Sequence, residues 1–269
     1  MAFRDLDRPP LDAAALKSAL VGPDRFWTDI VVTASTGSTN ADVAEAARAG
    51  APEGTVHTTD AQTSGRGRLD RTWESPAGSG IAVSVLLRPD NVPAGRWVWL
   101  PLLVGLAVDA TVRECGVESG LKWPNDVLVD GRKLAGILLE RVDSASGPAA
   151  IVGVGLNVTL RREELPVETA TSLQLEGATE TSRSIILRTY LRNLEALYRA
   201  WTASEGDPNA GIRDSYVRRC TTLGTRVRVE LPNDEVLEGL ATGIDDLGRL
   251  LVDGRAISAG DITHVRPAT

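Results

Sequence analysis

Residues 81–87 (IAVSVLL) constrain the fold of this chain more than any other segment. The run is almost continuously apolar, without the alternation of apolar and polar residues that marks a half-exposed strand. This is the pattern of a strand that is buried on both faces of its sheet. Other elements of the chain must therefore cover both faces of that sheet.

The rest of the first two hundred residues supplies both helices and strands. The strongest helix candidate is residues 97–114, where apolar side chains recur near helical spacing. Further helices are expected over residues 11–21, 41–49 and 182–203. Further strands are expected over residues 30–32, 55–60, 121–123, 127–129, 133–140 and 149–158. Because strands and helices do not strictly alternate, we predict an α+β fold with a mixed β-sheet and packed helices.

The pattern changes near Arg218, after which the apolar stretches become short. Residues 245–248 and 253–254 have the composition of hairpin turns. Short strands are expected over residues 227–229, 236–244 and 250–252. We therefore predict a small, all-β barrel at the end of the chain, with domains at residues 1–217 and 218–269.

Length, cysteine content and charge limit the class of protein. A chain of 269 residues can bury roughly three quarters of its unfolded surface, so it needs no disulfide to fold. Cys115 and Cys220 match no metal-ligand spacing, which indicates two core residues in a reducing, cytoplasmic compartment. Residues 1–10 lack the apolar run of a signal peptide, and we expect no membrane-spanning segment. The formal net charge of −7 disfavours a general nucleic-acid binder.

The loop at residues 62–73 (QTSGRGRLDRTW) is the first segment that indicates chemistry. Gly65 and Gly67 let backbone N–H groups approach an anion that a side chain would keep away. Three arginines within six residues would repel one another unless an anion lay between them, and their planar forks suit carboxylate and phosphate oxygens. The loop is neither a Walker loop nor a dinucleotide fingerprint. The alternative is a solvated basic loop.

Three other segments are each open to two interpretations. In Lys122-Trp123-Pro124-Asn125-Asp126 the proline ends a strand, so Lys122 either faces a pocket or lies on the surface. In residues 153–157 (GVGLN), two glycines inside an apolar strand mark either a bulge or a place where something lies against the backbone. Ser38-Thr39-Asn40 either caps the next helix or contributes to a site.

Two histidines, His57 and His264, are too few and too far apart for a metal site, so no metal site formed by a cluster of protein side chains is expected. Trp97 and Trp99 are interpreted as core or interface residues. Trp73 either shields the loop or packs into the core.

Taken together, these segments resemble the bacterial biotin–protein ligases. The resemblance runs from about residue 33 to 160. The residues that carry it are Ser38-Thr39-Asn40, Gln62, Gly65-Arg66-Gly67-Arg68, Trp73-Glu74-Ser75-Pro76, Lys122-Trp123-Pro124-Asn125-Asp126, Lys133-Leu134-Ala135-Gly136-Ile137-Leu138, and Gly153 to Asn157.

The resemblance implies a catalytic core related to class II aminoacyl-tRNA synthetases, followed by an SH3-like barrel. It also implies a two-step reaction, in which biotin and ATP form biotinyl-5′-AMP and the biotinyl group then passes to a lysine of a partner. The partner implied is a biotin carboxyl carrier domain of an acyl-CoA carboxylase, and Mg²⁺ is expected to arrive with ATP. A monomer or weak homodimer is expected.

Site residues follow from the same resemblance. The catalytic residues implied are Arg66, Arg68 and Lys122. The biotin-binding residues implied are Ser38, Thr39, Asn40, Gln62, Gly65, Arg66, Gly67, Arg68, Lys122, Gly136 and Gly155. The residues implied for ATP or the adenylate are Arg66, Arg68, Arg71, Trp73, Lys122, Asn125 and Asn157.

The chain departs from the family in two places. Asp70 stands where the family often has glycine, which puts the closing of the loop in doubt. Some relatives begin with a winged helix that binds an operator, whereas about 35 residues precede the first motif here, so we expect no DNA binding. Two alternatives remain, namely a lipoate or octanoate ligase on a similar core and a non-catalytic biotin or nucleotide sensor.

Overall fold

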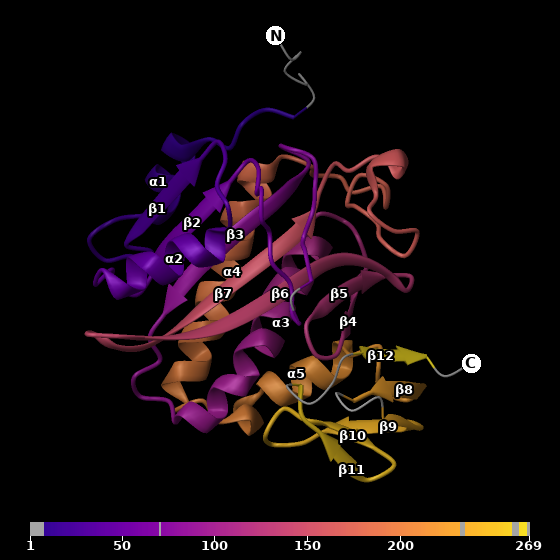
Figure 1. Ribbon diagram of the computed structural model, residues 1–269. Coiled ribbons are helices and arrows are strands. Elements are labelled where there is room, and N and C mark those ends of the chain that lie inside the picture. Colours follow the sequence, from indigo (N-terminus) through magenta and orange to yellow (C-terminus); the bar gives the residue numbers. More distant parts are fainter. Residues whose placement is uncertain (1–7, 70, 232–234, 260–263, 268–269) are drawn as a thin grey trace.

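A seven-stranded mixed sheet forms the body of the protein in the computed structural model, which describes residues 8–69, 71–231, 235–259 and 264–267 (Figure 1). The strand order is β1-β2-β3-β7-β6-β5-β4, with β1 and β2 parallel and the other neighbours antiparallel. The strands are β1 (Asp29–Thr33), β2 (Thr55–Thr59), β3 (Gly80–Leu87), β4 (Gly120–Lys122), β5 (Asp126–Val129), β6 (Arg132–Ser144) and β7 (Gly147–Asn157). The predicted α+β class is confirmed.

Helices cover both faces of this sheet, as the apolar run in β3 requires (Figure 1). The helices are α1 (Ala13–Leu20), α2 (Thr39–Arg48), α3 (Leu100–Glu114), α4 (Arg183–Ala203) and α5 (Ile212–Arg219). Single turns of 3₁₀ helix occur at η2 (Arg162–Glu164) and η3 (Pro208–Ala210), and a longer one at η1 (Ala94–Trp99). The main core lies against α3 and α4, and takes Val83 and Val85 from β3. The neighbouring residue Leu86 points to the other face, where it packs with Val43 of α2.

A second sheet of five antiparallel strands follows, in the order β11-β10-β9-β8-β12. Its strands are β8 (Arg226–Glu230), β9 (Val236–Ile244), β10 (Leu250–Val252), β11 (Arg255–Ile257) and β12 (His264–Pro267). The indole N–H groups of Trp99 and Trp123 donate to the carbonyls of Asp246 and Gly248, so two buried tryptophans tie this sheet to the body. The predicted small β domain is confirmed, while its boundary at 217/218, which falls within α5, stays a prediction.

The segment Ala94–Glu114 is long and apolar enough to cross a membrane by length and composition, with a hydropathy of 1.3. Within this stretch, 72% of the 18-residue window that has that hydropathy is buried inside the protein, and α3 packs against α4 and the sheet. Its apolar character therefore matches the role of a core helix.

Both cysteines are buried free thiols, as expected. Burial raises the pKa of Cys115 to about 11, with Glu180 and Glu114 adding to the effect, and burial also raises the pKa of Cys220. Since the thiolate is the reactive form, we expect an aromatic disulfide reagent at pH 8 to label neither thiol in the native protein and both after denaturation. The exposed Val98, replaced in a Val98→Cys variant, is the control and should be labelled at once. Rapid native labelling of Cys115 or Cys220 would contradict this assignment.

Candidate active site

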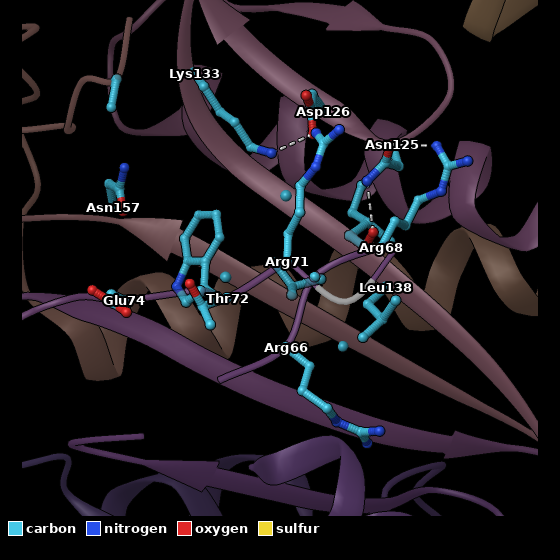
Figure 2. A pocket seen from close by; sticks show the side chains of 18 of the residues that line it. Arg66, Arg68, Arg71, Thr72, Glu74, Asn125, Asp126, Lys133, Leu138 and Asn157 are labelled. Carbon is cyan, nitrogen blue, oxygen red and sulfur yellow. Dashed lines mark hydrogen bonds and ion pairs between the residues drawn. The ribbon is translucent and has the colours of Figure 1, made fainter. Parts of the chain in front are cut away.

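A cavity of about 1000 Å³ opens on the face of the sheet that carries α2, and Figure 2 shows its interior. Its walls come from the start of α2, the loop at residues 66–74, the ends of β4 and β5, the middle of β6 and β7, and residues 166–170. The residues expected from the sequence that line it are Ser38, Thr39, Asn40, Gln62, Arg66, Gly67, Arg68, Arg71, Trp73, Lys122, Asn125, Gly136, Gly155 and Asn157. Gly65 is not among the lining residues, and Asp70 lies outside the described residues.

One end of the cavity is a network of neutral polar groups. Helix α2 begins at Thr39, and Ser38 is its N-cap residue, but the hydroxyl of Ser38 makes no capping hydrogen bond, so capping alone does not explain this segment. The backbone N–H of Thr39 donates instead to Gln62 Oε1 at 2.9 Å, and its hydroxyl lies 2.8 Å from that of Ser84. The Ser84 hydroxyl donates to Asn40 Oδ1 at 2.6 Å. The polar groups at this end are thus held in place by one another.

Arg66 is held by a carboxylate of β6. Its Nη2 lies 3.0 Å from Glu140 Oε2, and the same oxygen accepts a hydrogen bond from Asn40 Nδ2 at 2.7 Å. In Figure 2 the side chain of Arg66 extends away from those of Arg68 and Arg71. The structure therefore places Arg66 in the cavity wall without gathering its guanidinium with the other arginines, because Glu140 is the anion that it reaches.

Arg68 spans the cavity toward the second sheet. Its Nη1 donates to Asn125 Oδ1 at 3.3 Å, and its Nη2 donates to the carbonyl of Ala259. Burial lowers the pKa of Arg68, and the charge of Asp126 partly offsets that effect. A guanidinium nevertheless keeps its charge at neutral pH, so Arg68 is a fixed cation of the site.

Lys133 is a cation of the cavity to which the sequence analysis gave no role. Its Nζ lies 2.7 Å from Asp126 Oδ1 (Figure 2). The same Nζ lies 5.7 Å from the centroid of the Trp73 ring. Strict alternation along β6 would give Lys133 the same side as the buried Ala135, away from the cavity. The β5–β6 register shifts at this point, because Val127 pairs with Ala135 but Leu128 pairs with Lys133. This irregularity turns Lys133 to the cavity side, as bulges often do for residues beside active sites.

Glycines in β6 and β7 form the floor of the cavity. Gly136 and Gly155 are partners across the two strands, and the indole of Trp73 lies over both. A Cβ at Gly155 would overlap that ring, and one at Gly153 would overlap the amide of Asn40. Strand β7 stays in regular register here, so the two glycines mark not a bulge but close contacts, which are made by Trp73 and Asn40. Trp73 is partly exposed and is not a core residue.

Gly65 allows a close backbone contact within the loop at residues 62–73. The N–H of Trp73 donates to the carbonyl of Gly65 at 2.9 Å, and a Cβ at Gly65 would overlap the Trp73 carbonyl.

Asn157 is buried and its amide donates to Thr171 O at 2.9 Å, which fixes the wall beside residues 166–170. Within the described ranges, no cluster of three or more His, Cys, Asp or Glu side chains is arranged to hold a metal ion.

The fold and the cavity define a class of α+β proteins in which one cavity on a face of a mixed sheet has a neutral polar end and a cationic end, an arrangement suited to binding a ligand that is polar at one end and anionic at the other. Residues 32–157 match the sequence family described as "Biotin/lipoate A/B protein ligase family", and residues 222–265 match "Biotin protein ligase C terminal domain". The chain belongs to the biotin protein ligase family.

Individual relatives agree with that assignment. The chain is 44% identical to a biotin–[acetyl-CoA-carboxylase] ligase of Mycobacterium tuberculosis, over 99% of this chain and 100% of the relative. It is 34% identical to the bifunctional ligase/repressor BirA of Bacillus subtilis, over 88% of this chain and 72% of the relative. Among solved structures, the biotin protein ligase from Aquifex aeolicus in complex with biotin and ATP superposes with a TM-score of 0.76 at 27% identity, covering 90% of this chain and 100% of the other.

The contact between Gly155 and the Trp73 ring can be tested by adding one methyl group at Gly155. We expect Gly155→Ala to displace the Trp73 ring, because the new Cβ would overlap it. In protein labelled with 5-fluorotryptophan, the ¹⁹F resonance assigned through Trp73→Phe should shift, while the resonances of the buried tryptophans stay in place. Gly95→Ala, which adds a methyl group in open space, is the control and should leave every line unchanged. An unmoved Trp73 line in Gly155→Ala would contradict the proposed contact.

Proposed function

We propose that this protein is a biotin–[acetyl-CoA-carboxylase] ligase that activates biotin with ATP and transfers it to a lysine of a carrier domain. The observation that carries this proposal is the pair of unlike ends of one cavity, with Lys133 and Arg68 at one end and the Thr39–Gln62 network at the other. A relative of that name that matches over its full length supports it. The neutral end suits the ureido group of biotin, and the cationic end suits its carboxylate and the phosphates.

The first step needs these cations because both reactants are anions. Two like charges 4 Å apart repel by about 4 kcal/mol at an effective dielectric of about 20. Lys133, Arg68 and Arg71 lie in the walls of the cavity and would offset that repulsion. A carboxylate oxygen of biotin attacks the α-phosphorus of ATP, the bond to the bridging oxygen breaks, and pyrophosphate leaves with that electron pair.

The second step consumes the mixed anhydride. An acceptor lysine that has lost a proton attacks the acyl carbon of biotinyl-5′-AMP, the bond to the phosphate oxygen breaks, and AMP leaves as the amide forms. Asp126 lies beside Lys133 on the cavity wall and is the candidate acceptor of the proton. Lys122, on the neighbouring strand, adds a further cation near the leaving phosphate.

Mg²⁺ would enter with the nucleotide. Among the described residues that line the cavity, the carboxylates are Glu74 and Asp126. Mg²⁺ commonly takes one or two carboxylates, several waters and substrate phosphates. These residues fit that mode, and the ion would neutralise charge on the triphosphate. We further propose a cytoplasmic monomer or weak homodimer that acts on a biotin carboxyl carrier domain.

A ligase for lipoate or octanoate is the nearest alternative, because the family that matches residues 32–157 includes both kinds of enzyme. The match of residues 222–265 to the biotin protein ligase C-terminal domain favours biotin. The deciding experiment combines ATP, Mg²⁺, biotin and a carrier domain and weighs the carrier by mass spectrometry. A gain of one biotinyl group supports the proposal, whereas pyrophosphate exchange with lipoate but not with biotin would overturn it.

Substitutions at the cationic end distinguish a role in the adenylation step from a role in biotin binding. We expect Lys133→Ala to slow biotin-dependent ATP–pyrophosphate exchange by about 100-fold, since loss of one charge-stabilising donor typically costs that much, and to change the biotin Kd by less than about threefold. Lys122→Ala should act in the same direction. Lys17→Ala, which removes an exposed lysine of α1, is the control. An equal loss of exchange and of biotin affinity would instead favour a non-catalytic biotin sensor.

A further inference from the structure

Arg8, whose side chain is almost fully buried, forms an ion pair with a partly exposed residue far along the chain. Its side chain is only 6% exposed, and its two terminal nitrogens meet both carboxylate oxygens of Glu164, at 3.0 and 2.5 Å. Nη2 of Arg8 also donates to the carbonyl of Thr159 at 2.7 Å. The pairing lowers the pKa of Glu164, chiefly through the hydrogen bond from Arg8. A two-pronged pair of this kind fixes orientation as well as distance.

The backbone around Arg8 is itself fixed to the body of the protein. Arg183, a buried residue at the start of α4, donates to the carbonyl of Pro9 at 2.6 Å and pairs with Asp60 at 2.7 Å. The N–H of Leu11 donates to Asp60 Oδ1 at 3.2 Å. Residues 8–11 are therefore anchored to α4 and to the segments that follow β2 and β7, and Arg8 extends from this anchored segment.

The partner of Arg8 lies on a segment that forms a wall of the cavity. None of residues 161–169 is buried, so packing contributes little to holding this segment in place. Its residues Pro166, Val167 and Thr169 nevertheless line the cavity. At its far end the N–H of Lys133 donates to Thr169 O at 2.7 Å, so this wall borders the cationic end.

We propose that Arg8 and Glu164 are a positioning pair that holds residues 161–169 as the wall of the nucleotide end of the site. The proposal rests on the proposed function for the identity of the ligand. Without the pair, the segment would spend more time away from the cavity. The apparent affinity for a ligand falls in proportion to the population of the competent state, so a tenfold smaller closed population weakens nucleotide binding tenfold. Biotin, which we place at the opposite end, should be little affected.

The test uses the full chain with Arg8→Ala and with Glu164→Gln. In ligand-free protein, amide hydrogen exchange of residues 161–169 should accelerate in both variants. We expect the KM for ATP and the dissociation rate of biotinyl-5′-AMP to rise about tenfold, with kcat and the biotin Kd within twofold of the parent values. Arg8→Lys should restore part of the ATP affinity. Arg162→Ala removes an exposed arginine from the same segment and is the matched control.

The role of the Arg8–Glu164 pair can be refuted by either of two results. Unchanged amide hydrogen exchange of residues 161–169 in Arg8→Ala would overturn the proposal. Equal losses of ATP affinity and biotin affinity would overturn it as well. If Arg8→Ala does not fold, Glu164→Gln carries the test, because it keeps the shape of a partly exposed side chain. Absence of biotin-dependent pyrophosphate exchange in the parent protein would refute the proposed function. Amide hydrogen exchange of the ligand-free protein would still show whether Arg8 and Glu164 hold residues 161–169 in place.

Discussion

The site depends on side chains lying directly against bare backbone in the centre of the sheet. Strands β6 and β7 carry glycine where Asn40 and Trp73 approach them, and a Cβ at Gly153 or Gly155 would occupy the same space. Because those positions are glycine, the start of α2 and the loop at residues 66–74 can both reach the sheet and enclose a cavity between them. The fold thus gives up apolar packing at the middle of two central strands and gains a floor for ligands.

The charges of the cavity are arranged around that floor, and three of its cations have a partner close by. Glu140 holds Arg66, Asp126 holds Lys133, and the amide of Asn125 contacts Arg68. These carboxylates offset part of the positive charge of the cavity, although Arg71 still repels Arg68 and contributes to the lowered pKa of Arg68. An incoming phosphate can compete for the same guanidinium and ammonium groups, because it offers more acceptor oxygens and a higher charge. Since the described lining residues carry more cations than carboxylates, the cavity keeps an excess of positive charge that suits an anion.

The fold was largely predictable from the sequence, because apolar periodicity identified the central strands and the helices α3 and α4. Helix α5 was missed, since it is short and polar and only Ile212 and Tyr216 are buried. The cavity residues were identified mainly by family resemblance. The orientation of Lys133 could not be foreseen, because it follows from a shift in strand register, and the pairing of Arg66 joins residues 74 positions apart. Both depend on tertiary contacts that no local pattern encodes.

A crystal structure with a non-hydrolysable analogue of biotinyl-5′-AMP tests the central claim most directly, because it shows which side chains surround the acyl-phosphate linkage. The account predicts that Arg68 and Lys133 contact the phosphate oxygens, and that the guanidinium of Arg66 leaves Glu140 to join them. A bound analogue whose phosphate touches none of these three residues, with both ion pairs intact, would contradict it.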